Sequence, residues 1–173
     1  MEIERKYLVK EIPVLDGVEK KKIEQGYLCR GPVVRIRKSN EDYILTYKSK
    51  LGLSQEHAIQ NREVELPLTK EAYEHLKEKT DGSLIQKTRY LLPLEEGRTA
   101  ELDVFEGSLS GLAFVEVEFP SEEAAMQFVP PVWFGEDVSA FHSFSNGYLS
   151  EVQDYEAWLH AWEIEKNDFL LKK

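Results

Sequence analysis

Pairs of charged residues two positions apart recur along this chain and constrain its fold more than any other feature. The series opens with Glu2 and Glu4, which share a strand face with Lys6, and Arg35 and Arg37 repeat the spacing. The later pairs are Lys48 and Lys50, Glu63 and Glu65, Lys87 and Arg89, Glu101 and Asp103, and Glu116 and Glu118. Because the positions between them are mostly apolar, we predict seven strands that are charged on one face and apolar on the other.

Length and composition narrow the class of protein. The 173 residues suit one domain over residues 1–173, and the net charge of -10 argues against nucleic acid or an anionic membrane as a partner. No apolar run approaches the length of a membrane span, and the charged N-terminus argues against a secretory signal. Cys29 is the only cysteine, so no intrachain disulfide can form and we expect a cytoplasmic protein.

The same alternation and the turn residues place the expected elements. We expect strands at 1–8, 23–29, 33–39, 42–50, 60–67, 84–93, 98–106 and 112–119. Residues 11–22 contain Pro13 and Gly17 and predict an irregular connection or a short helix. Thr69 and Ser121 are expected to cap two short helices, and the apolar spacing near the C-terminus predicts one long helix over 147–168.

Strands with one charged and one apolar face can in principle bury either face. If the apolar faces pack under the helices, the charged faces turn toward one another, and about eight antiparallel strands can close around them. We therefore predict an α+β fold, in which a closed eight-stranded antiparallel β-barrel has a charged interior and helices packed outside.

A charged interior calls for a ligand, because desolvating so many ions costs several kcal/mol for each of them. The paired positions, with Lys6, supply eight acids and seven bases, and a ring of cross-strand salt bridges with nothing bound is one interpretation. A polyanion carried with divalent cations is the other, since bases hold phosphate oxygens and carboxylates hold Mg²⁺ or Mn²⁺. Two such ions would change a lumen charge of about -1 to roughly +3, which suits a triphosphate of about -4 to -5.

The order of these motifs resembles a known family. Glu2-Ile3-Glu4-Arg5-Lys6 matches the E-x-E-x-K signature of the CYTH superfamily, the triphosphate tunnel metalloenzymes, which include class IV adenylate cyclase and thiamine triphosphatase. The segments that follow in the family's order are Gln25–Leu28, Arg35–Arg37, Thr46–Lys48, Glu63–Glu65, Lys87–Tyr90, Glu101–Asp103 and Glu116–Phe119. The resemblance implies an eight-stranded antiparallel tunnel, divalent metal, and chemistry on tripolyphosphate, nucleoside triphosphates or thiamine triphosphate.

The resemblance also implies a role for each matching residue. The expected metal ligands are Glu2, Glu4, Glu116 and Glu118, with Glu63, Glu65 and Asp103 as secondary ligands or water-positioning groups. The expected phosphate-binding residues are Lys6, Arg35, Arg37, Lys48, Lys87 and Arg89. Lys50 and Glu101 match less firmly, and a structural ion-pair role stays open for both.

Two further positions have alternative interpretations. Tyr27 resembles a tunnel tyrosine that contacts a lysine in relatives, here Lys87, and otherwise is an aromatic residue of the wall. Bacterial relatives often carry a lysine or arginine shortly before a Y-S-N segment, whereas this chain has His142 before Ser143-Phe144-Ser145-Asn146. His142 is either a weaker, titrating cation at the tunnel end or a surface histidine.

The leading hypothesis is a metal-dependent triphosphatase that hydrolyses inorganic tripolyphosphate with Mg²⁺ or Mn²⁺. Glu4 and Lys6 would be catalytic, and Glu65 or Glu118 would orient the attacking water. The rival hypotheses are a class IV-type adenylate cyclase, a thiamine triphosphatase and a non-catalytic polyphosphate-binding protein. The expected partner is a small molecule that contains a triphosphate, and a homodimer is left open.

Overall fold

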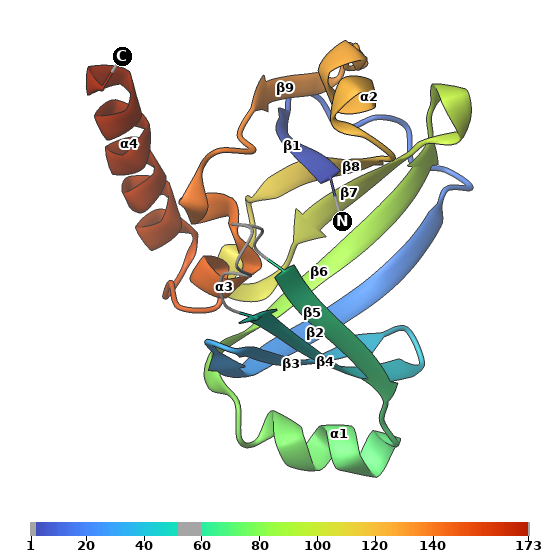
Figure 1. Ribbon diagram of the computed structural model, residues 1–173, viewed down its shortest axis with the longest axis vertical. Helices are drawn as coiled ribbons and strands as arrows, with labels where there is room; N and C mark the ends of the chain where they lie inside the picture. Colours follow the sequence, from blue (N-terminus) through green and yellow to red (C-terminus); the bar gives the residue numbers. More distant parts are fainter. Residues whose placement is uncertain (1–2, 52–59, 173) are drawn as a thin grey trace.

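One antiparallel sheet of nine strands forms the centre of the protein in the computed structural model, which describes residues 3–51 and 60–172 (Figure 1). The strands are β1 (Ile3–Val9), β2 (Glu19–Arg30), β3 (Val33–Ser39), β4 (Asp42–Leu51), β5 (Gln60–Pro67), β6 (Asp81–Pro93), β7 (Thr99–Phe105), β8 (Ala113–Phe119) and β9 (Phe134–Asp137). Their order across the sheet is β5-β4-β3-β2-β6-β7-β8-β1-β9. The α+β class is therefore confirmed.

The closed eight-stranded barrel, in contrast, is not confirmed, because the sheet has nine strands and is not closed over the described residues. A ninth strand, β9, pairs antiparallel with β1 through Tyr7 opposite Asp137 and Val9 opposite Phe134. This pairing occupies the edge of β1 that a barrel would need for closure, so β5 and β9 end the sheet over the described residues. The four residues of β9 show no clear alternation of polar and apolar side chains, which is why the sequence did not predict them.

The strand register confirms that the charged pairs share one face. Glu4 lies opposite Glu118 and Lys6 opposite Glu116, while Arg89 lies opposite Asp103. Directly paired residues of antiparallel strands project to the same side, and the remaining ladders continue this side as far as β5. We name this side the charged face, and it carries Glu4, Lys6, Arg35, Arg37, Lys48, Glu63, Glu65, Lys87, Arg89, Glu101, Asp103, Glu116 and Glu118.

Two apolar clusters pack on opposite faces of the sheet. Leu102, Val115 and Val117 lie on the outer face and pack with side chains from helix α2 (Glu122–Gln127). Ile85 and Phe114 project from the charged face and pack with the C-terminal segment, which is residues 138–172. The charged face is therefore apolar at one end, because burying these side chains there contributes roughly 25 cal/mol per Å² of apolar area removed from water.

The two predicted helix caps are confirmed. The hydroxyl oxygen of Thr69 accepts a hydrogen bond of 3.1 Å from the backbone N–H of Ala72 at the start of α1 (Lys70–Lys77). Ser121 accepts in the same way from Ala124 at the start of α2, also at 3.1 Å. Each hydroxyl satisfies a backbone donor that has no partner within its helix.

Strands β2 and β6 begin earlier than predicted. The expected irregular connection over 11–22 is wrong for residues 19–22, which extend β2 and pair with β6 from Glu19 opposite Leu91 onward. The pairing continues to Tyr27 opposite Asp81, so the residues after α1 enter the sheet directly. Long antiparallel pairing satisfies backbone groups that a loop would have to leave to water.

The single C-terminal helix over 147–168 is also wrong. The structure has a short helix α3 (Asn146–Leu149) and a separate helix α4 (Tyr155–Leu171). Asp154 begins α4 as its cap, since its carboxylate accepts a hydrogen bond of 2.9 Å from the N–H of Ala157. Among the described residues, no helix is both long and apolar enough to cross a membrane.

Glycine at position 82 should be required for the C-terminal segment to dock. Gly82 and Gly97 both have positive φ, at +76° and +71°, but a Cβ atom at Gly82 would collide with the backbone oxygen of Ser150, whereas one at Gly97 has nothing within 4 Å. We expect Gly97→Ala to lower the free energy of unfolding by about 1–2 kcal/mol, and Gly82→Ala by about 1–3 kcal/mol more. Urea denaturation measures both variants, and equal losses would contradict the docking contact.

Candidate functional site

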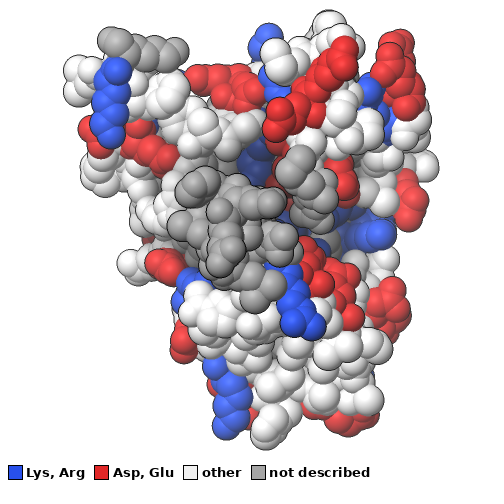
Figure 2. All heavy atoms as spheres, in the orientation of Figure 1, with Lys and Arg blue, Asp and Glu red and all other residues white. Residues whose placement is uncertain are grey.

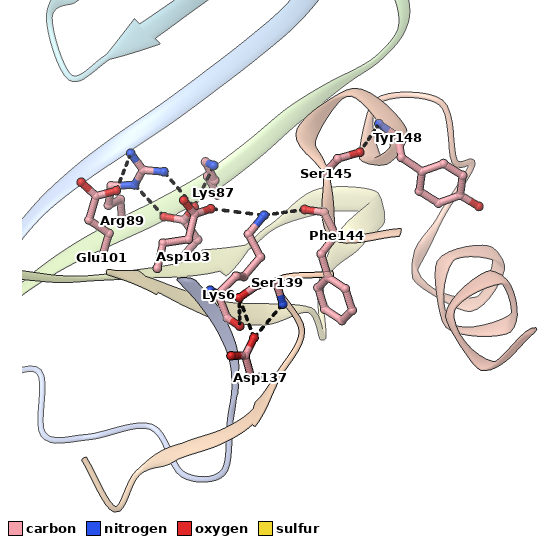
Figure 3. Close-up of polar contacts among 11 residues, drawn as sticks. Lys6, Lys87, Arg89, Glu101, Asp103, Asp137, Ser139, Phe144, Ser145 and Tyr148 are labelled. Atoms are coloured by element: carbon pink, nitrogen blue, oxygen red, sulfur yellow. Dashed lines mark hydrogen bonds and ion pairs between the residues drawn. The ribbon is translucent and has the colours of Figure 1, made fainter. Parts of the chain in front are cut away.

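Asp103 on β7 is held between two cations of β6. Its carboxylate accepts a hydrogen bond of 2.8 Å from the Nζ of Lys87, and Arg89 donates to both of its oxygens at 2.8 and 3.0 Å. The side chains of Asp103 and Lys87 are 1% and 0% exposed. Figure 3 shows these side chains pointing toward one another across the neighbouring strands. The three groups form a buried, hydrogen-bonded ion cluster.

The cluster remains ionised at neutral pH. Burial alone would raise the pKa of Asp103, but Lys87 and Arg89 outweigh it and lower the pKa to about 2. Burial lowers the pKa of Lys87 to about 8, with Arg89 and Arg37 acting in the same direction against the attraction of Asp103. Lys87 therefore keeps its proton at pH 7 and begins to lose it in mildly alkaline solution.

More cations surround the cluster than one carboxylate can neutralise. Arg37 on β3 is close enough for repulsion by Arg89 to act on it. Burial, together with Arg35 and Arg89, lowers the pKa of Arg37 to about 10. Figure 2 shows basic atoms deep in a hollow of the molecule and acidic atoms along its edge. Cations held where solvent access is restricted form a favourable site for a polyanion.

Lys6 on β1 connects the sheet to the C-terminal segment. Its Nζ lies 3.4 Å from the Oε1 of Glu116 on β8 and donates a hydrogen bond of 2.8 Å to the backbone oxygen of Phe144. The same nitrogen lies 4.5 Å from the centroid of the Phe114 ring. Figure 3 shows the Lys6 side chain extending between the carboxylates and Phe144. An ammonium group has three donors, so Lys6 can also contact a ligand.

The carboxylates of β1 and β8 have the chemistry of a divalent-metal site. Glu116 is mostly buried, which would raise its pKa, but Lys6 and the hydrogen bond that Glu116 shares with Glu4 outweigh the burial and lower it. Glu118 lies directly opposite Glu4 in the ladder. Neighbouring carboxylate oxygens are the ligands that Mg²⁺ and Mn²⁺ prefer, so this donor set fits such an ion.

The metal-ligand set is incomplete over the described residues. Within 3–51 and 60–172, no three Asp, Glu, His or Cys side chains are gathered in a metal-binding arrangement. Glu2, the fourth expected ligand, lies outside the described residues, as does the side chain of Lys50. Glu63 and Glu65 project from β5 at the far end of the sheet, where Glu63 lies 3.9 Å from Lys48.

The structure also separates the alternatives left open for two residues. Glu101 lies 3.2 Å from Arg89, which agrees with the ion-pair interpretation of Glu101. The expected contact of Tyr27 with Lys87 stays a prediction: Lys87 binds Asp103, and the guanidinium of Arg30 lies 5.6 Å from the centroid of the Tyr27 ring. Tyr27 is buried and therefore fits the wall interpretation.

His142 agrees with the interpretation as a surface histidine. Its side chain is exposed, and its ring centroid lies 5.4 Å from that of Tyr148. The backbone N–H groups of His142 and Ser143 donate to the carboxylate of Glu165, so α4 holds this turn in place. The residue at this position acts through its backbone, which no side-chain motif could have indicated.

Sequence reasoning assigned no role to two groups that reach the charged face. The first is the backbone oxygen of Phe144, which binds Lys6 and has no sequence signal. The second is Gln25 on β2, whose side chain is fully buried beside Arg37. The signal for Gln25 was present, since it is polar at an inward position between Ile23 and Tyr27, but it lies outside the charged pairs.

Comparison with known proteins gives consistent matches over most of the chain. The CYTH domain family matches residues 1–128. An inorganic triphosphatase of Nitrosomonas europaea is 42% identical over 153 residues, which cover 86% of this chain and 96% of that protein. An inorganic triphosphatase of Acetivibrio thermocellus is 33% identical over 150 residues, with coverage of 86% and 92%. The crystal structure of the inorganic triphosphatase NE1496 superposes with a TM-score of 0.70 at 37% identity, covering 89% of this chain and 97% of that one.

Removing the charge of Asp103 should destabilise the protein strongly. Asp103→Asn leaves Lys87 buried beside other cations, so we expect a loss of about 3–5 kcal/mol in the free energy of unfolding. Lys87→Met in the same chain should recover much of this loss, because the stranded charge is then gone. Urea denaturation of the wild type, both single variants and the double variant at pH 7 measures the coupling.

An exposed ion pair provides the control for this experiment. Lys22 pairs with Glu106 at 2.8 Å, but its side chain is 66% exposed. Lys22→Met should therefore cost less than about 1 kcal/mol. A loss from Asp103→Asn as small as that of this control would show that the buried cluster does not stabilise the fold.

Proposed function

Because the chain belongs to the CYTH domain family, we propose that it is a divalent-metal-dependent inorganic triphosphatase, which hydrolyses linear tripolyphosphate. Support comes from the two related inorganic triphosphatases, at 42% and 33% identity. The observation that carries the proposal is the group of buried cations around Asp103, on the same sheet face as the carboxylates of β1 and β8. The phosphates would bind at the cations of that face, and the divalent metal would bind at its carboxylates. A single cysteine, Cys29, further agrees with a cytoplasmic location.

The cations of β3 and β6 would bind the phosphate oxygens. Arg35 and Arg37 project from β3, and Lys87 and Arg89 project from β6, all on the charged face. A guanidinium can donate two parallel hydrogen bonds to one phosphate, which fixes its orientation as well as its position. Lys48 on β4 continues this basic lining toward β5 and would bind the end of a longer chain.

The carboxylates of the opposite half would hold the metal. Glu4, Glu116 and Glu118 would bind Mg²⁺ or Mn²⁺, with Glu2 completing the set, while Glu63 and Glu65 are the secondary ligands. We assign Asp103 to orienting Lys87 and Arg89 rather than to the ion, because those cations already occupy both of its oxygens. The ion would neutralise charge on the phosphate oxygens and lower the barrier to attack at phosphorus.

The hydrolysis itself needs positioning more than covalent catalysis. Water attacks the terminal phosphorus, the bond from phosphorus to the bridging oxygen breaks, and orthophosphate and pyrophosphate leave. Glu118 is exposed next to the carboxylate pair and would orient this water and accept its proton, with Glu65 as the alternative. Lys6 would donate its remaining N–H to the phosphate and stabilise charge that develops in the transition state.

Phosphate release from a panel of substrates tests the proposed function. We expect release from tripolyphosphate with Mg²⁺ or Mn²⁺, none with excess chelator, and much slower release from ATP and thiamine triphosphate. Colorimetric detection of orthophosphate makes the measurement, and chromatography detects cyclic AMP. Formation of cyclic AMP would favour the adenylate cyclase. Preferential turnover of thiamine triphosphate would favour the thiamine triphosphatase, and binding of tripolyphosphate without phosphate release would favour the polyphosphate-binding protein.

Two substitutions test the assigned residues. Lys6→Ala and Glu4→Gln should each lower the rate of tripolyphosphate hydrolysis by at least about 100-fold, since each removes a charge that the transition state needs. Circular dichroism should show the native fold in both variants. Lys22→Ala is the control, because Lys22 projects from β2 on the outer face and should leave the rate unchanged. Wild-type rates from Lys6→Ala or Glu4→Gln would refute the assignment.

A further inference from the structure

Gln25 is a fully buried polar residue on the charged face. It lies on β2 opposite Arg37 on one side and Ile85 on the other, and its relative exposure is 0%. Burying an amide removes up to four hydrogen bonds with water, so each of its polar atoms requires a partner. Gln25 belongs neither to the charged pairs nor to the expected metal ligands, so the proposed hydrolysis leaves its burial unexplained.

The hydrogen bond to Arg37 fixes which way the amide points. The Nε–H of Arg37 donates to the Oε1 of Gln25 at 2.8 Å. A guanidinium can only donate, so the amide oxygen must face Arg37 and the NH₂ group must face away from it. Within the described part of the chain, this buried NH₂ group has no hydrogen-bond partner.

Arg35 supplies a second buried donor without a partner over residues 3–51 and 60–172. The Nε of Arg35, two residues from Arg37 on the same face of β3, is also buried without a partner among the described residues. The charges of Arg89 and Asp103 act on the pKa of Arg37, and the charge of Arg37 acts on the pKa of Lys87, so these groups lie close together. Donors collected in a cationic environment are complementary to an anionic oxygen and to little else.

We propose that Gln25 is a substrate-binding residue whose NH₂ group donates to a phosphate oxygen of the bound triphosphate while its oxygen holds Arg37 in position. This inference rests on the proposed function for the identity of the anion. It extends the phosphate-binding set from the charged residues of β3 and β6 to a neutral residue of β2, the strand between them.

The chemistry of the amide explains why the position is glutamine. Glutamate would accept from Arg37 equally well, but its charge would neutralise the guanidinium and repel phosphate. Lysine would donate to phosphate, but it would leave Arg37 without an acceptor and add a further like charge. Only a side chain that accepts on one side and donates on the other serves both neighbours.

The variants Gln25→Met and Gln25→Glu test the proposal. Each removes the donor, and Gln25→Glu keeps an acceptor for Arg37. We expect KM for tripolyphosphate with Mg²⁺ to rise about 10- to 100-fold in Gln25→Met and further in Gln25→Glu, with kcat changed much less. Titration calorimetry with tripolyphosphate in EDTA should show weaker binding in the same order. Melting temperatures of the two variants are measured beside these values.

A matched control and two contrary outcomes complete the test. Gln86→Met replaces the same side chain on the neighbouring strand β6, where it is exposed on the outer face, and should leave KM and affinity unchanged. Gln25→Met with wild-type KM and affinity would overturn the inference, whatever its melting temperature. A wild-type protein that binds tripolyphosphate without hydrolysing it refutes the proposed function only, because the affinities still test Gln25.

Discussion

The ion cluster of Lys87, Asp103 and Arg89 is the interaction on which the arrangement of the charged face depends. Buried cations are tolerated only where a carboxylate compensates them, and Asp103 compensates two at once through three hydrogen bonds. Asp103 does not compensate every cation there, since Arg37 lies in the same region. The fold therefore holds buried cations on the face to which we assign the polyanion.

The charged face is apolar at one end and carries the buried ions at the other. At one end Ile85 and Phe114 pack against the C-terminal segment and form an apolar core that offsets the cost of the buried ions. Lys6 links that segment to the site through the oxygen of Phe144, and α4 holds the same turn through Glu165. The proposed phosphate binding and the C-terminal packing thus share one lysine, so we expect changes at either to affect the other.

Site residues and structural residues have different partners in this fold. Asp103 has both oxygens bound and serves to orient cations, whereas Gln25 keeps a buried donor without a partner among the described residues. An unpaired buried donor costs stability, and a water molecule or an oxygen of a ligand can supply its acceptor.

The spacing of charges predicted seven of the strands, because a side-chain period of two follows from the extended backbone, and it placed Lys87, Arg89 and Asp103 on one face correctly. The caps at Thr69 and Ser121 were equally local and therefore predictable. Only the tertiary structure decided that β9 takes the free edge of β1, that Phe144 binds Lys6 and that Gln25 faces Arg37. The first two contacts join segments distant in sequence, so no local pattern encodes them, and the third depends on the register of β2 against β3.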